Sequence, residues 1–233
     1  MSFQVAYIPI GVGTFHLESA QAEFEKSVQM LTSLADVKCP EKMLLTIPDL
    51  TALLDGLDPD LIVLQNITFA NAAYATEVLK RFQCPVLLWT LREPVIDGGR
   101  LRLNSLTGAY SAANAIRAFR DGEFEYVFGS PDEAKGEIGA AIRAAQVLYD
   151  LKHLKLASIG HTPQGFGFGR AMDAEIACKF GVTLESIEVR ELIDRAKGYS
   201  DEECLTDLEE AKKSLVGLDQ TPEKNVKDFA RLY

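Results

Sequence analysis

Polar and aromatic side chains stand just after several apolar segments of this sequence, where buried parallel strands would end. Ligands of open parallel sheets bind beyond the carboxyl ends of the strands, so we expect these side chains to line one crevice. A sugar would exchange hydrogen bonds with the polar members, and a tryptophan ring would cover an apolar face of the sugar. The residues that we predict to bind substrate are Phe15, His16, Asn66, Trp89, Arg92 and Glu93. Gln65 and Ser130 occupy equivalent positions and complete the predicted crevice.

Two glycine-rich turns resemble nucleotide-binding fingerprints but lack their defining residues. Gly11 and Gly13 follow the first apolar segment, yet His16 stands where the dinucleotide motif requires its third glycine. Gly160 and Gly165 have the spacing of a phosphate-binding loop, but no lysine follows them to reach a phosphate. The sequence therefore predicts no nucleotide cofactor. Backbone amides of the second turn could still hold an anion, or the turn could be purely structural.

A long polar loop follows the tryptophan and precedes an alanine-rich helix. It contains Arg92, Arg100 and Arg102, whose planar guanidinium groups suit a carboxylate or a phosphate. The same arginines could instead be solvated, or pair with Glu93 and Asp97. Long loops at this position of an α/β sheet often carry function, so both alternatives stay open.

Metal ligands and nucleophiles do not occur in any recognisable spacing. The histidines are His16, His153 and His161, and the sequence has neither an H-x-x-x-H nor an H-E-x-x-H segment. It also lacks a G-x-S-x-G segment and a C-x-x-C pair. We therefore predict no catalytic residue and no metal ligand in this chain.

Composition limits the classes of partner. The chain has 233 residues and a formal net charge of −10, without a basic stripe, which disfavours nucleic acid and anionic membrane surfaces. No segment approaches the roughly 18 consecutive apolar residues of a membrane span, and the first residues resemble a strand rather than a signal peptide. Four scattered cysteines are typical of reduced thiols. We expect a cytoplasmic protein with no nucleic-acid partner and no membrane partner.

Short apolar segments alternate with helical patterns over most of the chain. Continuous apolar segments predict strands that are covered on both faces, and the alternation predicts parallel βαβ units. The predicted fold class is α/β, a doubly wound parallel sheet with flavodoxin-like (Rossmann-like) strand order, over residues 1–152. Its five strands are expected at residues 3–10, 43–47, 61–64, 86–89 and 126–128.

A second α/β domain is predicted to start at residue 153 and to continue to residue 233. It offers strands at residues 155–159 and 183–189, with a helix at 170–180 between them, and only helices afterwards. Two strands do not make a stable open sheet. We therefore expect this domain to be incomplete, and to be completed by further chain or by a partner.

Residues 7–19 read Tyr-Ile-Pro-Ile-Gly-Val-Gly-Thr-Phe-His-Leu-Glu-Ser, and they resemble the first strand and turn of the L-fucose/L-arabinose isomerase family. In arabinose isomerases the turn reads Gly-Ser-Gln-His-Leu-Tyr-Gly. Gly13, His16 and Leu17 match this turn. Phe15 replaces a glutamine that contacts the substrate in that branch, which argues against arabinose as substrate.

Other stretches carry the same resemblance. Residues 85–89 are similar to the fucose-type strand whose terminal tryptophan, Trp89 in this chain, reaches the sugar site of a neighbouring subunit. Residues 155–166 look like the opening of the family's second domain. The resemblance therefore extends over both predicted domains.

The resemblance implies an aldose–ketose isomerase of carbohydrate metabolism that acts on a small-molecule sugar with a divalent cation, usually Mn²⁺. This reaction needs a Lewis acid on the carbonyl and hydroxyl oxygens, and a base that moves a proton. The family's metal ligands come from later domains and have no counterpart in this chain, so we do not expect catalysis by the chain alone. The chain is expected to supply oligomer contacts and part of a sugar site, in a homo-oligomer or with a carboxy-terminal partner domain.

Two other functions stay open at the sequence level. Two α/β units that flank a cleft also describe periplasmic-binding-type folds, so the chain could be a non-enzymatic sugar-binding or sensing module. A nucleotide-binding flavodoxin-like protein is the third alternative, and the incomplete glycine motifs disfavour it.

Overall fold

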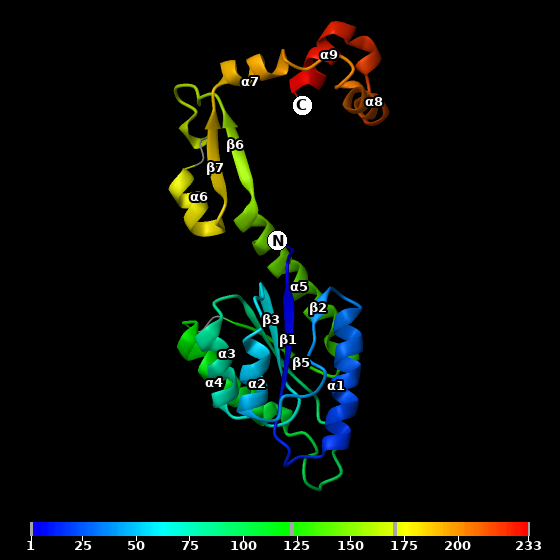
Figure 1. Ribbon diagram of the computed structural model, residues 1–233, viewed down its shortest axis with the longest axis vertical. Helices are drawn as coiled ribbons and strands as arrows, with labels where there is room; N and C mark the ends of the chain where they lie inside the picture. The colour runs from blue at the N-terminus through cyan, green and yellow to red at the C-terminus, as the bar shows by residue number, and fades with distance from the viewer. Residues whose placement is uncertain (1, 122–123, 170–171, 233) are drawn as a thin grey trace. The chain divides into compact units, whose positions relative to one another are not determined.

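Contacts between residues divide the chain into two compact units, residues 1–150 and 151–233, in this computed structural model (Figure 1). The structure describes residues 2–121, 124–169 and 172–232. Each unit has its own parallel sheet. Among the described residues, no helix has the length and apolar character needed to cross a lipid bilayer.

Five parallel strands form the sheet of the first unit, in the spatial order β2-β1-β3-β4-β5. The strands are β1 (Val5–Ile10), β2 (Val37–Lys38), β3 (Leu61–Asn66), β4 (Val86–Thr90) and β5 (Glu125–Phe128). Every residue of β1, β3 and β4 is buried, as expected for strands that are covered on both faces. The order is that of doubly wound flavodoxin-like proteins, so the predicted fold class and strand order are confirmed.

Helices cover both faces of this sheet and create two apolar cores (Figure 1). In one core, α1 and α5 pack against Tyr7, Trp89 and other strand residues that point to their side. In the other core, α2, α3 and α4 pack against the alternate residues, such as Ile8 and Leu88. The helices of this unit are α1 (Leu17–Thr32), α2 (Ile47–Leu54), α3 (Ala72–Arg81), α4 (Ser105–Phe119) and α5 (Pro131–His153).

The second strand of the sheet lies earlier in the chain than predicted. Residues 43–47 are not a strand, because only Leu44 forms an isolated bridge, with Ile10. The apolar run ends at a helix cap instead: the Thr46 hydroxyl accepts a hydrogen bond from the Asp49 N–H in the first turn of α2. The strand that pairs with β1 on the side away from β3 is β2, which has only two residues and therefore little pattern to detect.

The sheet of the second unit contains two parallel strands, β6 (Lys155–Ile159) and β7 (Thr183–Ile187). All five residues of β6 are exposed, so this strand lacks the double cover of the strands in the first unit. A small core between α8 and α9 consists of Cys204, Leu208, Val226 and Ala230. The other elements are η1 (Gly167–Gly169), α6 (Asp173–Phe180), α7 (Val189–Ala196), α8 (Leu205–Ser214), η2 (Leu218–Gln220) and α9 (Glu223–Leu232). The predicted start of α6, Arg170, lies outside the described residues.

Candidate functional site

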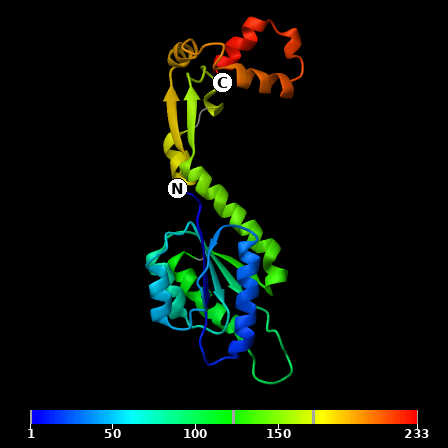
Figure 2. The ribbon, with the colours of Figure 1, turned by 45° about the vertical axis from the view of Figure 1, so that its right-hand side comes forward.

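The carboxyl ends of β1, β3 and β4 meet three connecting segments, one of which is the long loop that extends beyond the sheet in Figure 2. The Val12 N–H donates to Oγ1 of Thr68 over 2.8 Å, and joins the β1–α1 turn to the β3–α3 loop. The Phe69 N–H donates to the Leu103 carbonyl over 2.9 Å, and joins the latter loop to the long one. Hydrogen bonds therefore bridge the turn and the loops at the sheet edge where we predicted the crevice.

Glu93 closes the long loop between β4 and α4, residues 91–104. Its carboxylate accepts hydrogen bonds from three consecutive backbone N–H groups, those of Arg102 (2.6 Å), Leu103 (3.0 Å) and Asn104 (3.0 Å). Hydrogen bonds to an ionised acceptor are stronger than neutral ones, so this contact orders the loop. The carboxylate oxygens that we predicted to contact a sugar are engaged by the protein's own backbone.

Arg92 lies at the surface beside the end of β5. Its Nε donates to both carboxylate oxygens of Glu133, at 3.1 and 3.0 Å, and its guanidinium carbon lies 4.8 Å from the centre of the Phe128 ring. The Glu133 carboxylate also accepts from the backbone N–H of Ser130, at 2.9 Å. The Ser130 N–H first, and Arg92 second, hold the pKa of Glu133 below its ordinary value. Arg92 is therefore an exposed arginine that is already positioned by a partner.

Trp89 does not reach the surface. The side chain is fully buried in the core beneath α1 and α5, and Nε1 donates to the Gly129 carbonyl over 3.0 Å. A ring that covers a face of a sugar must be exposed, so this geometry gives Trp89 a packing role in place of the stacking role that we predicted. The sequence indicated that Trp89 lies at the end of a strand, but not how deeply its side chain is buried. Both faces of β4 are covered, so the side chains of this strand are buried on either face.

Gln65 and Asn66, the last residues of β3, are also buried. The Gln65 amide accepts from the Tyr7 hydroxyl and donates to the Ser27 hydroxyl over 3.1 Å, while burial raises the pKa of Tyr7 well above its ordinary value. The Asn66 amide has no hydrogen-bond partner among the described residues. Its nitrogen lies 2.7 Å from the point that a Cβ on Gly108 would occupy. Neither amide reaches the surface at which we expected it to meet a sugar.

Phe15, His16 and Arg100 form the accessible part of this edge, and we call them the Phe15 cluster. Nδ1 of His16 accepts from the Ser19 N–H over 3.2 Å and caps α1. The guanidinium carbon of Arg100 lies 5.2 Å from the centre of the Phe15 ring, and its Nη2 donates to the Thr14 carbonyl over 3.1 Å. The cluster thus brings an aromatic ring and a cation together, and the imidazole of the next residue is exposed and caps α1.

The tip of the long loop carries exposed apolar side chains that the sequence pattern did not identify as functional. Ile96 is 81% exposed, and Val95 and Leu101 are exposed as well. The sequence left open whether the arginines of this loop are available to bind an anion or pair with Glu93 and Asp97. Among the described residues, neither Arg92 nor Arg100 pairs with these two carboxylates.

A divalent cation needs about three or more converging carboxylate, imidazole or thiolate ligands from the protein. Among residues 2–121, 124–169 and 172–232, no three His, Cys, Asp or Glu side chains come together in this way. The donors of the described residues therefore do not fit the Mn²⁺ that the family resemblance implies.

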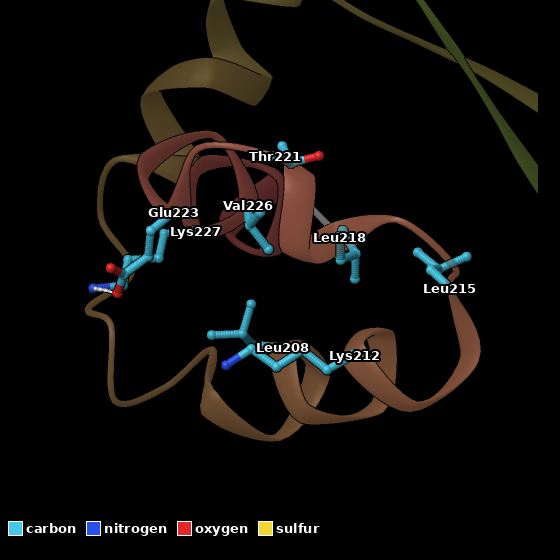
Figure 3. Close-up of a pocket in the computed structure, with 8 residues that line it drawn as sticks. All are labelled: Leu208, Lys212, Leu215, Leu218, Thr221, Glu223, Val226 and Lys227. Atoms are coloured by element: carbon cyan, nitrogen blue, oxygen red, sulfur yellow. Dashed lines mark ion pairs between the residues drawn. The ribbon is translucent and has the colours of Figure 1, made fainter.

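A hollow of about 470 Å³ lies between α8, η2 and α9 in the second unit (Figure 3). Leu208 of α8 faces Leu218 and Val226 across it, and an ion pair of 3.0 Å between Glu223 and Lys227 lies at one end. The lining is largely aliphatic and includes none of the residues predicted to bind a sugar. It suits apolar contact better than proton transfer.

No protein-family model matches this chain. The chain is 62% identical over 234 residues to a protein of Clostridium sp. (strain MSTE9) named sulfoquinovose isomerase, and the alignment covers 99% of the chain. Proteins of the same name from Priestia aryabhattai and Alkalicoccus urumqiensis are 34% and 31% identical, over 97% of the chain. The chain is similar to sugar isomerases.

Each of these alignments covers 52% of the relative, so the chain spans about half the length of the curated relatives it matches. Their name agrees with the coarser prediction of a sugar isomerase. It differs from the L-fucose and L-arabinose isomerases that the resemblance named. The strand and turn of residues 7–19, on which the resemblance rests, indicate a shared fold. Nothing in these residues specifies which sugar is bound.

Proposed function

We propose that this chain is the amino-terminal half of an aldose–ketose isomerase that acts on sulfoquinovose, a sugar that carries a sulfonate group. The observation that carries the proposal is the 62% identity to a sulfoquinovose isomerase across almost the whole chain. The two α/β units and the sheet order agree with the sugar-isomerase resemblance of the sequence. In this proposal the L-fucose/L-arabinose isomerases are a related group with other substrates.

The proton transfer and the Lewis acid of the proposed reaction belong to the part of the enzyme that this chain does not cover. Moving a proton between neighbouring carbons needs a base and a polarised carbonyl, for which Mn²⁺ is the proposed cofactor. The lack of fit between the described side chains and a cation supports this division. The chain's own contribution is to bind and orient the sugar and to exclude water.

The Phe15 cluster is the part of the chain that we propose to contact the sugar. A sulfonate keeps its negative charge at all physiological pH values, so it favours an accessible guanidinium such as that of Arg100. Arg100 is held against Phe15 and the Thr14 carbonyl, which lowers the conformational entropy lost on binding. Arg92 is a second candidate for this role because its side chain is also exposed.

A hybrid enzyme tests the proposed function. In this hybrid, the chain replaces the aligned half of the Clostridium relative, and formation of the ketose from sulfoquinovose is followed by NMR with and without Mn²⁺. We expect turnover by the hybrid with Mn²⁺ and none by the chain alone, and L-fucose and L-arabinose serve as control substrates. Turnover by the chain alone, or a folded hybrid that binds Mn²⁺ but leaves sulfoquinovose unchanged, would contradict the proposal.

A non-enzymatic sugar-binding module is less well supported. The relatives that align with 97–99% of the chain carry the name of an enzyme. A thermal-shift series with sulfoquinovose and without metal, on the chain alone and on the hybrid, discriminates the two functions. A module should bind the sugar as tightly in the chain alone as in the hybrid, whereas the isomerase half holds only part of the sugar site and should bind it more weakly in the chain alone.

A further inference from the structure

Strand β5 forms an unprotected edge of the five-stranded sheet. It pairs only with β4, through contacts such as Leu88 beside Tyr126 and Thr90 beside Phe128. Among the described residues, no backbone hydrogen bond joins β5 to any element on its other side. An open edge of this kind is a template on which another strand can pair.

One face of this edge is aromatic. Tyr126 and Phe128 share the face of Leu88, which is covered by α4, whereas Val127 points into the opposite core. Tyr126 and Phe128 are 44% and 40% exposed, and Tyr110 of α4 beside them is 69% exposed. Aromatic side chains are enriched at the centres of protein interfaces, and we call these three residues the edge aromatics.

We propose that β5 pairs antiparallel with β5 of a second copy of this chain, so that two five-stranded sheets become one continuous sheet. The two-fold axis of such a pair is perpendicular to the sheet, and therefore only residues of the same face can lie opposite one another. With Val127 opposite Val127, Tyr126 of each copy lies opposite Phe128 of the other. The edge aromatics of both copies then meet on one face as cross-strand pairs.

Each copy carries a net charge of −10, so the acidic residues at the paired edge matter for this register. The only ionisable carboxylate of β5 is Glu125, which lies opposite Gly129 of the second copy in this register. Gly129 adjoins Glu133, whose carboxylate is already paired with Arg92. This register therefore brings Glu125 near a carboxylate that is already ion-paired with Arg92, and it places no two acidic strand residues opposite each other.

The exposed area is consistent with a dimer of ordinary size. The exposed fractions of the three edge aromatics add up to about one and a half whole aromatic side chains. This corresponds to an exposed area on the order of 250–400 Å². A stable interface buries about 800 Å² on each partner. The paired backbone, and exposed residues of α4 such as Leu106 and Arg117, supply the remainder. The proposed interface does not depend on the isomerase activity, although Phe128 also packs against Arg92.

Cysteine cross-linking of the full chain tests both the partner and the register. Opposite residues of antiparallel strands have Cα atoms about 4.5–5.5 Å apart, within the roughly 4.4–6.8 Å that a disulfide spans. All variants carry Cys178→Ser, which removes the exposed native thiol. We expect an equimolar mixture of Tyr126→Cys and Phe128→Cys to form at least about ten times more disulfide dimer than either variant alone. Tyr199→Cys, at an exposed aromatic residue of the second unit, is the matched control and should stay uncross-linked.

Sedimentation velocity of the unmodified chain provides the second measurement. We expect a concentration-dependent equilibrium of monomer and dimer that Tyr126→Asp shifts at least about tenfold toward monomer, with an unchanged circular dichroism spectrum. A chain that stays monomeric at all concentrations would overturn the proposal. More cross-linking by Tyr126→Cys alone than by the mixture would overturn the register, because it would place Tyr126 opposite itself.

Discussion

At the scale of the residue, the candidate site depends on which polar atoms are already engaged. The carboxylate of Glu93 bonds three backbone N–H groups, and the indole N–H of Trp89 bonds a carbonyl. Arg100 uses one nitrogen to reach Thr14, and keeps the rest of its guanidinium available. Loss of the Arg100 side chain should therefore weaken the binding of an anionic substrate and change the stability of the fold little.

We predict that Arg100→Ala in the hybrid enzyme raises KM for sulfoquinovose about tenfold or more, the effect of losing roughly 1.4 kcal/mol of binding. The free energy of unfolding should change by less than about 0.5 kcal/mol, because the residue is exposed. Arg190→Ala, at an exposed arginine of the second unit, is the control. If steady-state kinetics give the same KM for Arg100→Ala and Arg190→Ala, Arg100 does not contact the sugar.

Glu133 gives a prediction about pH. Because its pKa is lowered in the folded chain, its contribution to stability is present above the ordinary pKa of a glutamate and is lost as the pH falls through the lowered value. We expect a carboxyl ¹³C titration to place the midpoint below the ordinary value. In Arg92→Ala the midpoint should rise only part of the way, because the Ser130 N–H is the larger cause. A complete return to the ordinary value would contradict that order of causes.

At the scale of the element, the loop of residues 91–104 is held by one side chain and by neighbouring backbone. We predict that Glu93→Ala lowers the free energy of unfolding by about 1.5–3 kcal/mol, the range for hydrogen bonds to an ionised group. Amide exchange at residues 102–104 should accelerate, because their N–H groups lose their acceptor. Asp97→Ala is the control: within the described part of the chain Asp97 accepts one backbone bond, from Gly99, and urea unfolding should change little.

Helix α4 approaches β3 closely at Gly108, where a Cβ would lie 2.7 Å from the Asn66 amide nitrogen and 2.8 Å from the Ala70 nitrogen. We predict that Gly108→Ala lowers the free energy of unfolding by about 1–3 kcal/mol through overpacking. Gly136→Ala in α5 should instead raise it by about 0.5–1 kcal/mol, because a Cβ at Gly136 meets nothing within 4 Å. Denaturant unfolding of the two variants makes the comparison, and equal effects would contradict the close approach.

At the scale of the whole molecule, the two units differ in how their sheets are covered. Strands β1, β3 and β4 are buried on both faces, whereas β6 is exposed along its whole length. Two strands and a small core between α8 and α9 bury little apolar surface, and little burial means little stability against local opening. The second unit should therefore open more readily than the first.

Hydrogen exchange measures this difference. We predict that amides of β6 and β7 exchange at least about 100-fold faster than those of β1 and β3 in the chain alone. In the hybrid enzyme, exchange in β6 and β7 should slow if the remaining half covers their sheet, while β1 and β3 serve as the internal reference. Equal protection of both sheets in the chain alone would contradict the prediction.

The fold was largely predictable from the sequence, and the site was not. Strand order followed from continuous apolar segments that alternate with helices, whereas β2 was missed because two residues carry no pattern. The sequence placed Trp89 and Asn66 at strand ends, which is correct, but it could not tell that α1 and α5 would cover Trp89 or that α4 would approach Asn66. Glu93 was predicted to bind a sugar because of its residue type and its place after β4. Its actual partners are backbone amides, which leave no trace in side-chain spacing.

The contact between Glu93 and the backbone of residues 102–104 has a consequence for how this protein can diverge. Nearly every residue type supplies a backbone N–H group. The hydrogen bonds to the Glu93 carboxylate can therefore persist when Arg102, Leu103 or Asn104 is replaced. Lengthening the segment between the two anchor points adds only a small closure cost, since that cost grows with the logarithm of loop length. Residues 94–101 are therefore a region in which insertions and substitutions can accumulate without disturbing the sheet, and in which related enzymes can acquire different specificities.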